Sequence, residues 1–167
     1  MYWGEPAILA GGVGGAALRL PKPYGDGALL ESHAMQGLHL TADLHDCRCT
    51  TQWLTDATLL GQRCVRAVRD AGLQPVGQLV HAFPATPDGP GGVTATVLLA
   101  ESHLCIHTWP ERRAATLDVY VCNFGADHSA KAQALMAALL ALFEATRVER
   151  HVLQRGAGST PEAVAIA

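Results

Sequence analysis

Hydrophobic and polar residues alternate through Gly37–Cys47, where the sequence reads GLHLTADLHDC. Leucine and alanine occupy every second position, and histidine, threonine and aspartate fill the positions between them. A period of two is typical of a β-strand with one buried face and one polar face. Similar patterns predict further strands at 74–83, 93–100, within 98–111, at 114–124 and at 147–156.

Two segments instead show helical spacing. The first covers 55–72, with Thr55 or Asp56 as its N-terminal cap and Gly72 as its end. The second is an amphipathic helix predicted over 127–146, with Asp127 or Ser129 as its cap. The order is strand, helix, three or four strands, helix and strand. It predicts an α+β fold in which two helices pack on one face of an antiparallel β-sheet, forming a two-layer sandwich.

Composition places this fold in one domain. The chain has 167 residues, of which 49% are hydrophobic and 16% are charged, as in a globular protein. We predict a folded domain at 36–156, a disordered N-terminal extension at 1–35 and a flexible tail at 157–167. The N-terminal GGVGG is not a phosphate-binding loop, since no strand precedes it and no Gly-Lys-Ser/Thr follows.

Charge and cysteine content exclude several classes of function. The net charge of −3 and the scattered basic residues argue against nucleic-acid binding. No stretch reaches the roughly 18–20 apolar residues that a membrane span needs. Five cysteines, an odd number, favour reduced thiols in the cytoplasm. Cys47 and Cys49 lack the second Cys/His pair of a zinc module, so we predict no metal site.

The stretch LLAESHLCIHTWPE, residues 98–111, concentrates groups that can carry chemistry. Ser102 lies between Glu101 and His103, but the glycines of a hydrolase nucleophile elbow are absent. His103, Cys105 and His107 share one face of the predicted strand. Their spacing covers about 13 Å, so one metal ion cannot contact all three unless the strand bends. A packing role is an equally good interpretation of His103 and of Cys105.

The run ESHLCIHTWPE followed by LDVYVC resembles the bacterial S-adenosylmethionine decarboxylase proenzymes, which depend on a pyruvoyl group. The match is ungapped from Glu101 to Cys122, and weaker resemblance extends from about Gly37 to the second predicted helix. This resemblance implies a decarboxylase that acts on S-adenosylmethionine and supplies the aminopropyl donor for spermidine synthesis. It also implies a homo-oligomer of cleaved α and β chains.

The resemblance implies that the chain cuts itself between Glu101 and Ser102. The Ser102 hydroxyl attacks the Glu101 carbonyl, and elimination then leaves a covalent pyruvoyl group in place of Ser102. His107 matches the processing base of the family. Thr94 matches a hydroxyl in the substrate pocket that assists the cyclic intermediate.

The same resemblance assigns the residues of catalysis. The pyruvoyl carbonyl forms a Schiff base with the substrate amine and accepts the electrons released with CO2. Cys122 matches the proton donor, a task that suits a thiol. Glu111 matches the carboxylate that holds the ribose hydroxyls, and Phe83 matches an aromatic ring that stacks on adenine.

Two departures from the family pattern keep alternatives open. The loop Pro84–Gly92 is longer than usual, and Arg112 and Arg113 follow Glu111 near the expected pocket. A pyruvoyl-dependent arginine or ornithine decarboxylase on the same scaffold is therefore one alternative. A non-catalytic regulatory paralogue is another, although it would not need Ser102, His107 and Cys122.

Overall fold

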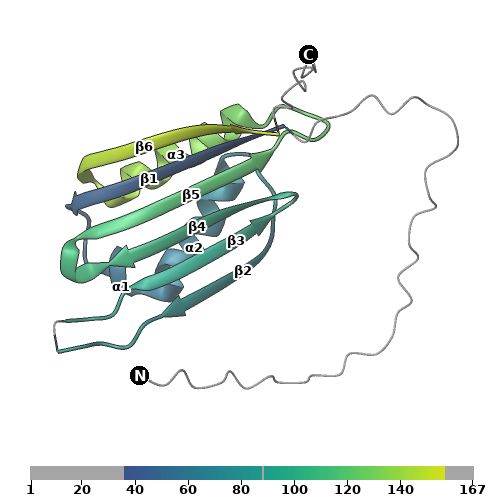
Figure 1. Cartoon of the computed structure of the whole chain (residues 1–167). Helices are drawn as coiled ribbons and strands as arrows, with labels where there is room; N and C mark the ends of the chain where they lie inside the picture. Colours follow the sequence, from purple (N-terminus) through teal and green to yellow (C-terminus); the bar gives the residue numbers. More distant parts are fainter. Residues whose placement is uncertain (1–35, 88, 157–167) are drawn as a thin grey trace, which may run out of the picture. The chain divides into compact units, whose positions relative to one another are not determined.

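The computed structural model describes residues 36–87 and 89–156, so the segments predicted to be disordered or flexible, 1–35 and 157–167, lie outside the described residues. Six strands form one antiparallel sheet in the order β2-β3-β4-β5-β1-β6 (Figure 1). Their bounds are β1 Gly37–Cys47, β2 Pro75–Ala82, β3 Val93–Leu99, β4 Ser102–Trp109, β5 Ala114–Cys122 and β6 Ala145–Arg155. All the predicted strands are thereby confirmed.

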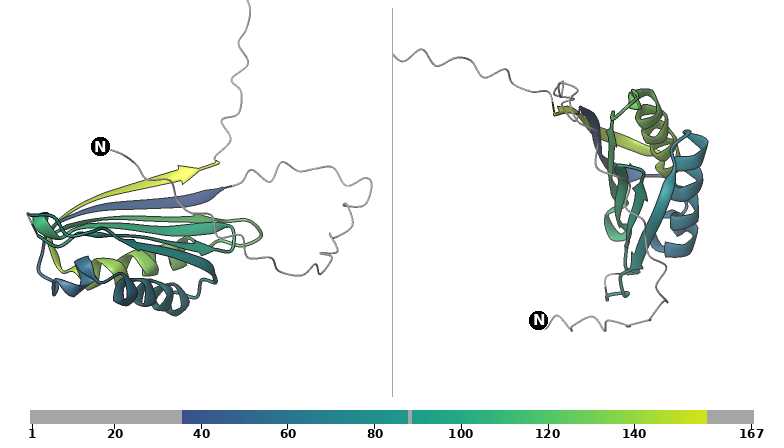
Figure 2. Two further views of the ribbon diagram at one scale, coloured as in Figure 1. Left: turned by 90° about the horizontal axis from the view of Figure 1, so that it is seen from below. Right: turned by 90° about the vertical axis from the view of Figure 1, so that its right-hand side faces the viewer.

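The helices of the described residues all lie on one face of this sheet (Figure 2). They are α1 Gln52–Thr55, α2 Ala57–Asp70 and α3 Ser129–Phe143, with a 3-10 turn, η1, at Pro110–Arg112. The predicted two-layer α+β architecture is confirmed, and the short α1 is an addition to it. Within the described part of the chain, no helix is long and apolar enough to cross a membrane.

Local sequence explains where α2 begins and ends. The Asp56 carboxylate caps the helix by accepting a hydrogen bond of 2.9 Å from the Leu59 N–H. Gly72 follows the helix with φ of 76°, a left-handed conformation that glycine adopts without steric cost. Leu60, Cys64 and Val68 form the buried stripe that faces the sheet.

The start and outer surface of α3 differ from the prediction. The N-cap residue is His128 rather than Asp127 or Ser129, and its side chain makes no capping hydrogen bond. The Asp127 carboxylate instead accepts the Ser129 N–H at 2.8 Å, and hydrogen bonds from Ser129 lower the pKa of Asp127. Alanines occupy much of the exposed side, at positions 130, 134, 137 and 141, so the helix is less amphipathic than predicted.

The opposite face of the sheet, which we call the open face, has no helix over it within residues 36–87 and 89–156. Leu104 and Ile106 of β4 are fully buried on the helix side. Because side chains alternate along a strand, His103, Cys105 and His107 project from the open face. The core therefore lies between sheet and helices, and the chemically capable side chains line the other surface.

Candidate active site

The predicted cleavage site lies in the turn between β3 and β4. Leu99 pairs with Ser102, which leaves Ala100 and Glu101 as a two-residue connection. Glu101 has φ of 63°, in the left-handed region that residues other than glycine rarely adopt. This conformation costs roughly 1–2 kcal/mol. The Glu101–Ser102 bond thus follows a strained residue.

Pairing of β4 with β5 brings Ser102 and Cys122 together. The Cys122 backbone N–H donates a hydrogen bond of 3.0 Å to the Ser102 hydroxyl oxygen. A hollow of about 440 Å³ adjoins them, lined by Glu101, Tyr120, Cys122 and Phe124. We call it the Ser102 pocket. The predicted scissile bond and the predicted proton donor are therefore neighbours, although 20 positions separate Ser102 from Cys122 in sequence.

A second pair of predicted residues meets across β3 and β4. Thr94 lies opposite His107 in the strand register. The Thr94 hydroxyl oxygen is 2.7 Å from Nδ1 of His107, which is hydrogen-bonding distance. The structure thus places a hydroxyl beside an imidazole, a contact that the sequence alone does not predict.

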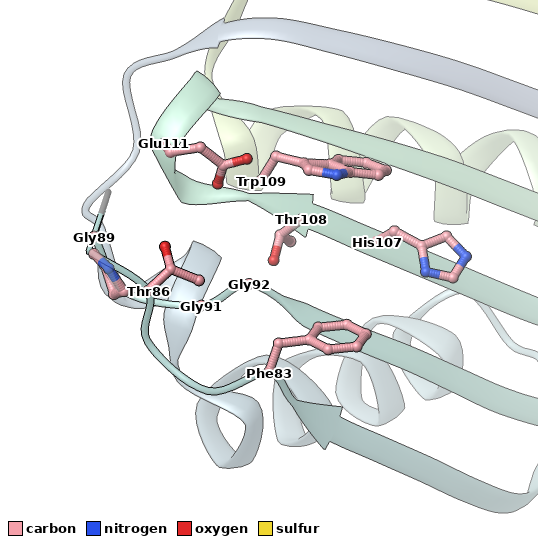
Figure 3. A pocket seen from close by; sticks show the side chains of 10 residues that line it. Phe83, Thr86, Gly89, Gly91, Gly92, His107, Thr108, Trp109 and Glu111 are labelled. Atoms are coloured by element: carbon pink, nitrogen blue, oxygen red, sulfur yellow. The ribbon is translucent and has the colours of Figure 1, made fainter. Parts of the chain in front are cut away.

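A larger hollow of about 530 Å³ lies beside His107. Phe83, His107, Trp109 and Glu111 line it, together with Thr86, Thr108 and residues 89–92 (Figure 3). We call it the His107 hollow. It brings together Phe83 from the end of β2 and Glu111 from η1, which are the predicted adenine and ribose contacts.

Glycine is required where the 84–92 loop returns to the sheet. A Cβ atom on Gly92 would lie 2.0 Å from the Thr108 carbonyl oxygen, and one on Gly91 would lie 2.1 Å from the Phe83 carbonyl oxygen. Neither position can hold a side chain without moving backbone. This close approach sets Phe83 and the start of β3 beside β4, where the His107 hollow forms.

The Ser102 pocket and the His107 hollow lie at opposite ends of β4. His107 lies five positions after Ser102, which at the usual rise of a strand corresponds to about 16 Å. The predicted processing base and the bond that it should process are therefore apart within one copy of the chain.

The remaining candidates on the open face have other partners. His103 lies 3.2 Å from one carboxylate oxygen of Asp118, and His39 lies 2.8 Å from the other. Cys105 contacts the Thr96 hydroxyl at 3.5 Å. The described residues include no cluster of three or more side chains suited to a metal ion. The alternating sequence showed that His39 and Asp118 are polar positions, but only the strand register brings them together.

Arg113 serves the fold rather than the His107 hollow. It adopts a left-handed conformation with φ of 48°. Its Nε donates to the Cys47 carbonyl at 2.8 Å, and its guanidinium also bonds the Cys49 carbonyl. Among the described residues that line the hollow, neither Arg112 nor Arg113 is present.

The Cys47 thiol, whose backbone carbonyl accepts from Arg113, stays protonated at neutral pH. Burial of this thiol is the main cause and the charge of the neighbouring Cys49 is the second, and together they raise the pKa of Cys47 to about 11.

Thr108 has a structural role that the sequence pattern does not indicate. Its buried hydroxyl donates to the Leu54 carbonyl at 2.7 Å and accepts the Val93 N–H at 2.8 Å. These bonds tie α1 and the start of β3 to β4, directly behind the His107 hollow. No periodic signal could reveal this role, because the partners are distant in sequence.

Comparison with known proteins gives this arrangement a family. Residues 38–156 match the family described as S-adenosylmethionine decarboxylase. The chain belongs to the S-adenosylmethionine decarboxylase family. This match spans every strand from β1 to β6, with Ser102, His107 and Cys122 inside it.

Individual members of the S-adenosylmethionine decarboxylase family align over most of their length. The S-adenosylmethionine decarboxylase proenzyme of Parasynechococcus marenigrum (strain WH8102) is 37% identical over 131 residues, which are 78% of this chain and 91% of the relative. The proenzyme of Persephonella marina is 34% identical over 120 residues, 72% of this chain and 82% of the relative. The crystal structure of the adenosylmethionine decarboxylase from Aquifex aeolicus VF5 has a TM-score of 0.64 at 31% identity, covering 75% of this chain and 95% of that one.

Proposed function

We propose that this protein cuts its own chain at Glu101–Ser102 and then decarboxylates S-adenosylmethionine, giving the aminopropyl donor for spermidine synthesis. The observation that carries the proposal is the turn at Glu101. A strained residue precedes the bond to be cut, and the Cys122 N–H holds the Ser102 hydroxyl oxygen at 3.0 Å. Membership of the family and the names of the relatives support the substrate.

The turn is suited to an exchange of amide for ester. The Ser102 hydroxyl oxygen attacks the Glu101 carbonyl carbon, the C–N bond breaks, and the nitrogen leaves as a free amine. Removal of the Ser102 Cα proton then expels the Glu101 carboxylate and leaves a dehydroalanine, which water converts to a pyruvoyl group with loss of ammonia. The left-handed strain at Glu101 favours the first step, because it raises the energy of the amide that is lost.

The residues around Ser102 fit this prosthetic group. When formed, the pyruvoyl group supplies a carbonyl that accepts the electrons released with CO2. Cys122 adjoins the position through its backbone contact with Ser102, and its thiol provides a proton donor for the product carbon. In the His107 hollow, Glu111 offers a carboxylate to the ribose hydroxyls and Phe83 offers a ring to the adenine.

Separation of the two ends of β4 has a direct consequence for assembly. His107 cannot reach Ser102 in the same copy, since about 16 Å lies between them. We infer a homodimer in which two open faces meet about a two-fold axis, so that the Ser102 pocket of one copy faces the His107 hollow of the other. Exposed apolar side chains on the open face, Leu79, Leu98, Trp109 and Leu153, support such a contact.

The alternatives are less well supported by the site. The arginine pair suggests an arginine or ornithine decarboxylase only if these side chains reach the substrate. Arg113 is instead bonded to backbone carbonyls away from the His107 hollow. A regulatory paralogue would have no need of the Thr94–His107 pair or of the strained turn. The five free cysteines are consistent with a reducing, cytoplasmic location.

Intact mass and substrate assays on one sample test the proposal. The wild-type 17.6-kDa chain should yield fragments of 101 residues and of the remaining 66 residues, and Ser102→Ala should stay intact. Labelled CO2 should appear from S-adenosylmethionine and not from arginine or ornithine. An uncleaved wild-type chain with full activity would contradict the mechanism, and release from arginine or ornithine alone would contradict the substrate.

A further inference from the structure

A carboxylate between two imidazoles lies beside the Ser102 pocket without a part in the chemistry above. Nε2 of His39 is 2.8 Å from one oxygen of Asp118, and Nε2 of His103 is 3.2 Å from the other. Because a carboxylate only accepts hydrogen bonds, each Nε2 that bonds to it must carry the proton. We call these three residues the Asp118 clamp. They join the neighbouring strands β1, β5 and β4 (Figure 1).

Tyr120 connects the Asp118 clamp to the pocket. Its ring lies 5.8 Å from the His39 ring and 5.6 Å from the His103 ring, measured between centroids. The Arg155 guanidinium carbon is 4.9 Å from the centre of the same ring. Tyr120 also lines the Ser102 pocket with Cys122. The clamp therefore supports one wall of the pocket.

The position of the clamp in the chain relates it to self-cleavage. His103 is the residue immediately after Ser102, and the Glu101–Ser102 bond is the covalent link between β3 and β4 at this end of the sheet. Once that bond is cut, β4 begins at the former Ser102 as a free chain end. Chain ends fray unless side chains or hydrogen bonds hold them.

We propose that the Asp118 clamp is the anchor that holds the new end of β4 in register beside Cys122 after the chain has cut itself. Asp118 is thus a positioning residue that acts through His103. The proposal rests on the proposed function, because it requires the cut at Glu101–Ser102. It concerns the mature protein rather than the cleavage reaction.

One detail of the uncut chain supports this order of events. Oδ1 of Asp118 is buried and accepts no hydrogen bond from any described residue, although Nε2 of His103 is only 3.2 Å away. The distance suits a hydrogen bond and the alignment does not. A change in the orientation of the His103 ring would complete this hydrogen bond, and we expect that change once the Ala100–Glu101 turn has been cut.

Asp118→Asn is the informative change, since it keeps the size of the side chain. An amide has one oxygen and one NH2 group, so it can accept from only one of the two Nε2–H groups. The variant should still cleave itself. Its melting temperature should fall by about 4 °C more in the cleaved protein than in the uncleavable Ser102→Ala background.

Kinetics provide a second measurement. In the cleaved Asp118→Asn protein, kcat should fall roughly tenfold, as expected for the loss of a hydrogen bond to a charged group. KM should change little, because Glu111 and Phe83 lie at the other end of β4. A merely structural role would lower stability equally in both backgrounds and would not separate kcat from KM.

Glu149→Gln is the matched control. Glu149 forms a similar pair with His45 on the β1–β6 side of the sheet, at 3.9 Å and away from the cut. Its replacement should change the melting temperature equally in cleaved and uncleaved protein. Equal shifts for Asp118→Asn in the two backgrounds, or accumulation of an uncleaved Asp118→Asn chain, would overturn the proposal. A wild-type chain that is never cleaved would instead contradict the proposed function, which requires the cut at Glu101–Ser102.

Discussion

The two ends of β4 are built in opposite ways. At its start, a two-residue turn with a strained Glu101 holds Ser102 against the Cys122 backbone. At its end, the strand opens into a hollow of about 530 Å³ bordered by an exposed Phe83 and Glu111. The first end offers strain and close contact, which suit the breaking of a bond. The second offers space and varied polar groups, which suit the binding of a ligand.

Under the proposed function, one chain therefore carries two half-sites rather than one complete site. A β-strand is stiff, so residues at its two ends cannot meet within a single sheet. In the proposed homodimer, the Ser102 pocket of each copy meets the His107 hollow of the other copy, so that two complete sites form.

The largest expected effect comes from mixing two inactive chains. Ser102→Ala has no residue to convert, and His107→Ala has no processing base, so each should remain uncleaved alone. In a mixed dimer, Ser102 of the His107→Ala chain should meet His107 of the Ser102→Ala chain. Co-expression followed by intact mass should show cleavage of the His107→Ala chain only.

The same mixture contains its own control, because the Ser102→Ala chain cannot be cut in any dimer. Absence of any cleaved product from stably mixed dimers would mean that Ser102 and His107 do not act across copies. Cleavage of His107→Ala expressed by itself would show that His107 is not the processing base.

An intermediate effect is expected at the Ser102 end. Cys122→Ala should still cut the chain, because the backbone N–H that holds the Ser102 hydroxyl oxygen remains. Decarboxylation should fall about 100-fold or more with loss of the proton donor. Labelled CO2 release on fully cleaved protein measures this. Cys105→Ser is the matched control and should keep its activity, whereas wild-type turnover by Cys122→Ala would remove Cys122 from the mechanism.

The smallest effect is expected at the His107 end. Glu111→Gln keeps the shape of the side chain but weakens its acceptance of ribose hydroxyls, so KM should rise roughly tenfold with cleavage unchanged. Steady-state kinetics with S-adenosylmethionine measure the shift. Asp70→Asn, in an exposed pair with Arg66, should leave KM as it is. An unchanged KM in Glu111→Gln would take Glu111 out of the binding site.

Most of the fold could be predicted because its signals are local. The alternation over Gly37–Cys47 predicts β1, and Asp56 and Gly72 predict the two ends of α2. The start of α3 was placed less well, since Asp127 and Ser129 both offer capping groups and the N-cap residue is His128. Strand order was predicted only as antiparallel, because pairing of β1 with both β5 and β6 depends on contacts distant in sequence.

The candidate site shows a similar division. The resemblance indicates Ser102, His107, Glu111 and Cys122 in the run 101–122, and Phe83 and Thr94 before it, but it predicts no contacts between them. The structure places Thr94 beside His107 and Ser102 beside Cys122. The two pairs lie apart because β4 is a stiff strand between them, and the sequence alone does not indicate this separation. The Asp118 clamp was also missed, because it arises from the register of three strands.

Cys105 gives the molecule a natural position for a reporter group. It is half-buried on the open face, whereas Cys47, Cys49, Cys64 and Cys122 are all buried. It lies midway between Ser102 and His107 on β4, so in the proposed homodimer a two-fold axis that joins these residues across copies would pass close to it. Two Cys105 thiols would then face each other, and a short thiol cross-linker would report the pairing of the copies in solution without any change to the sequence.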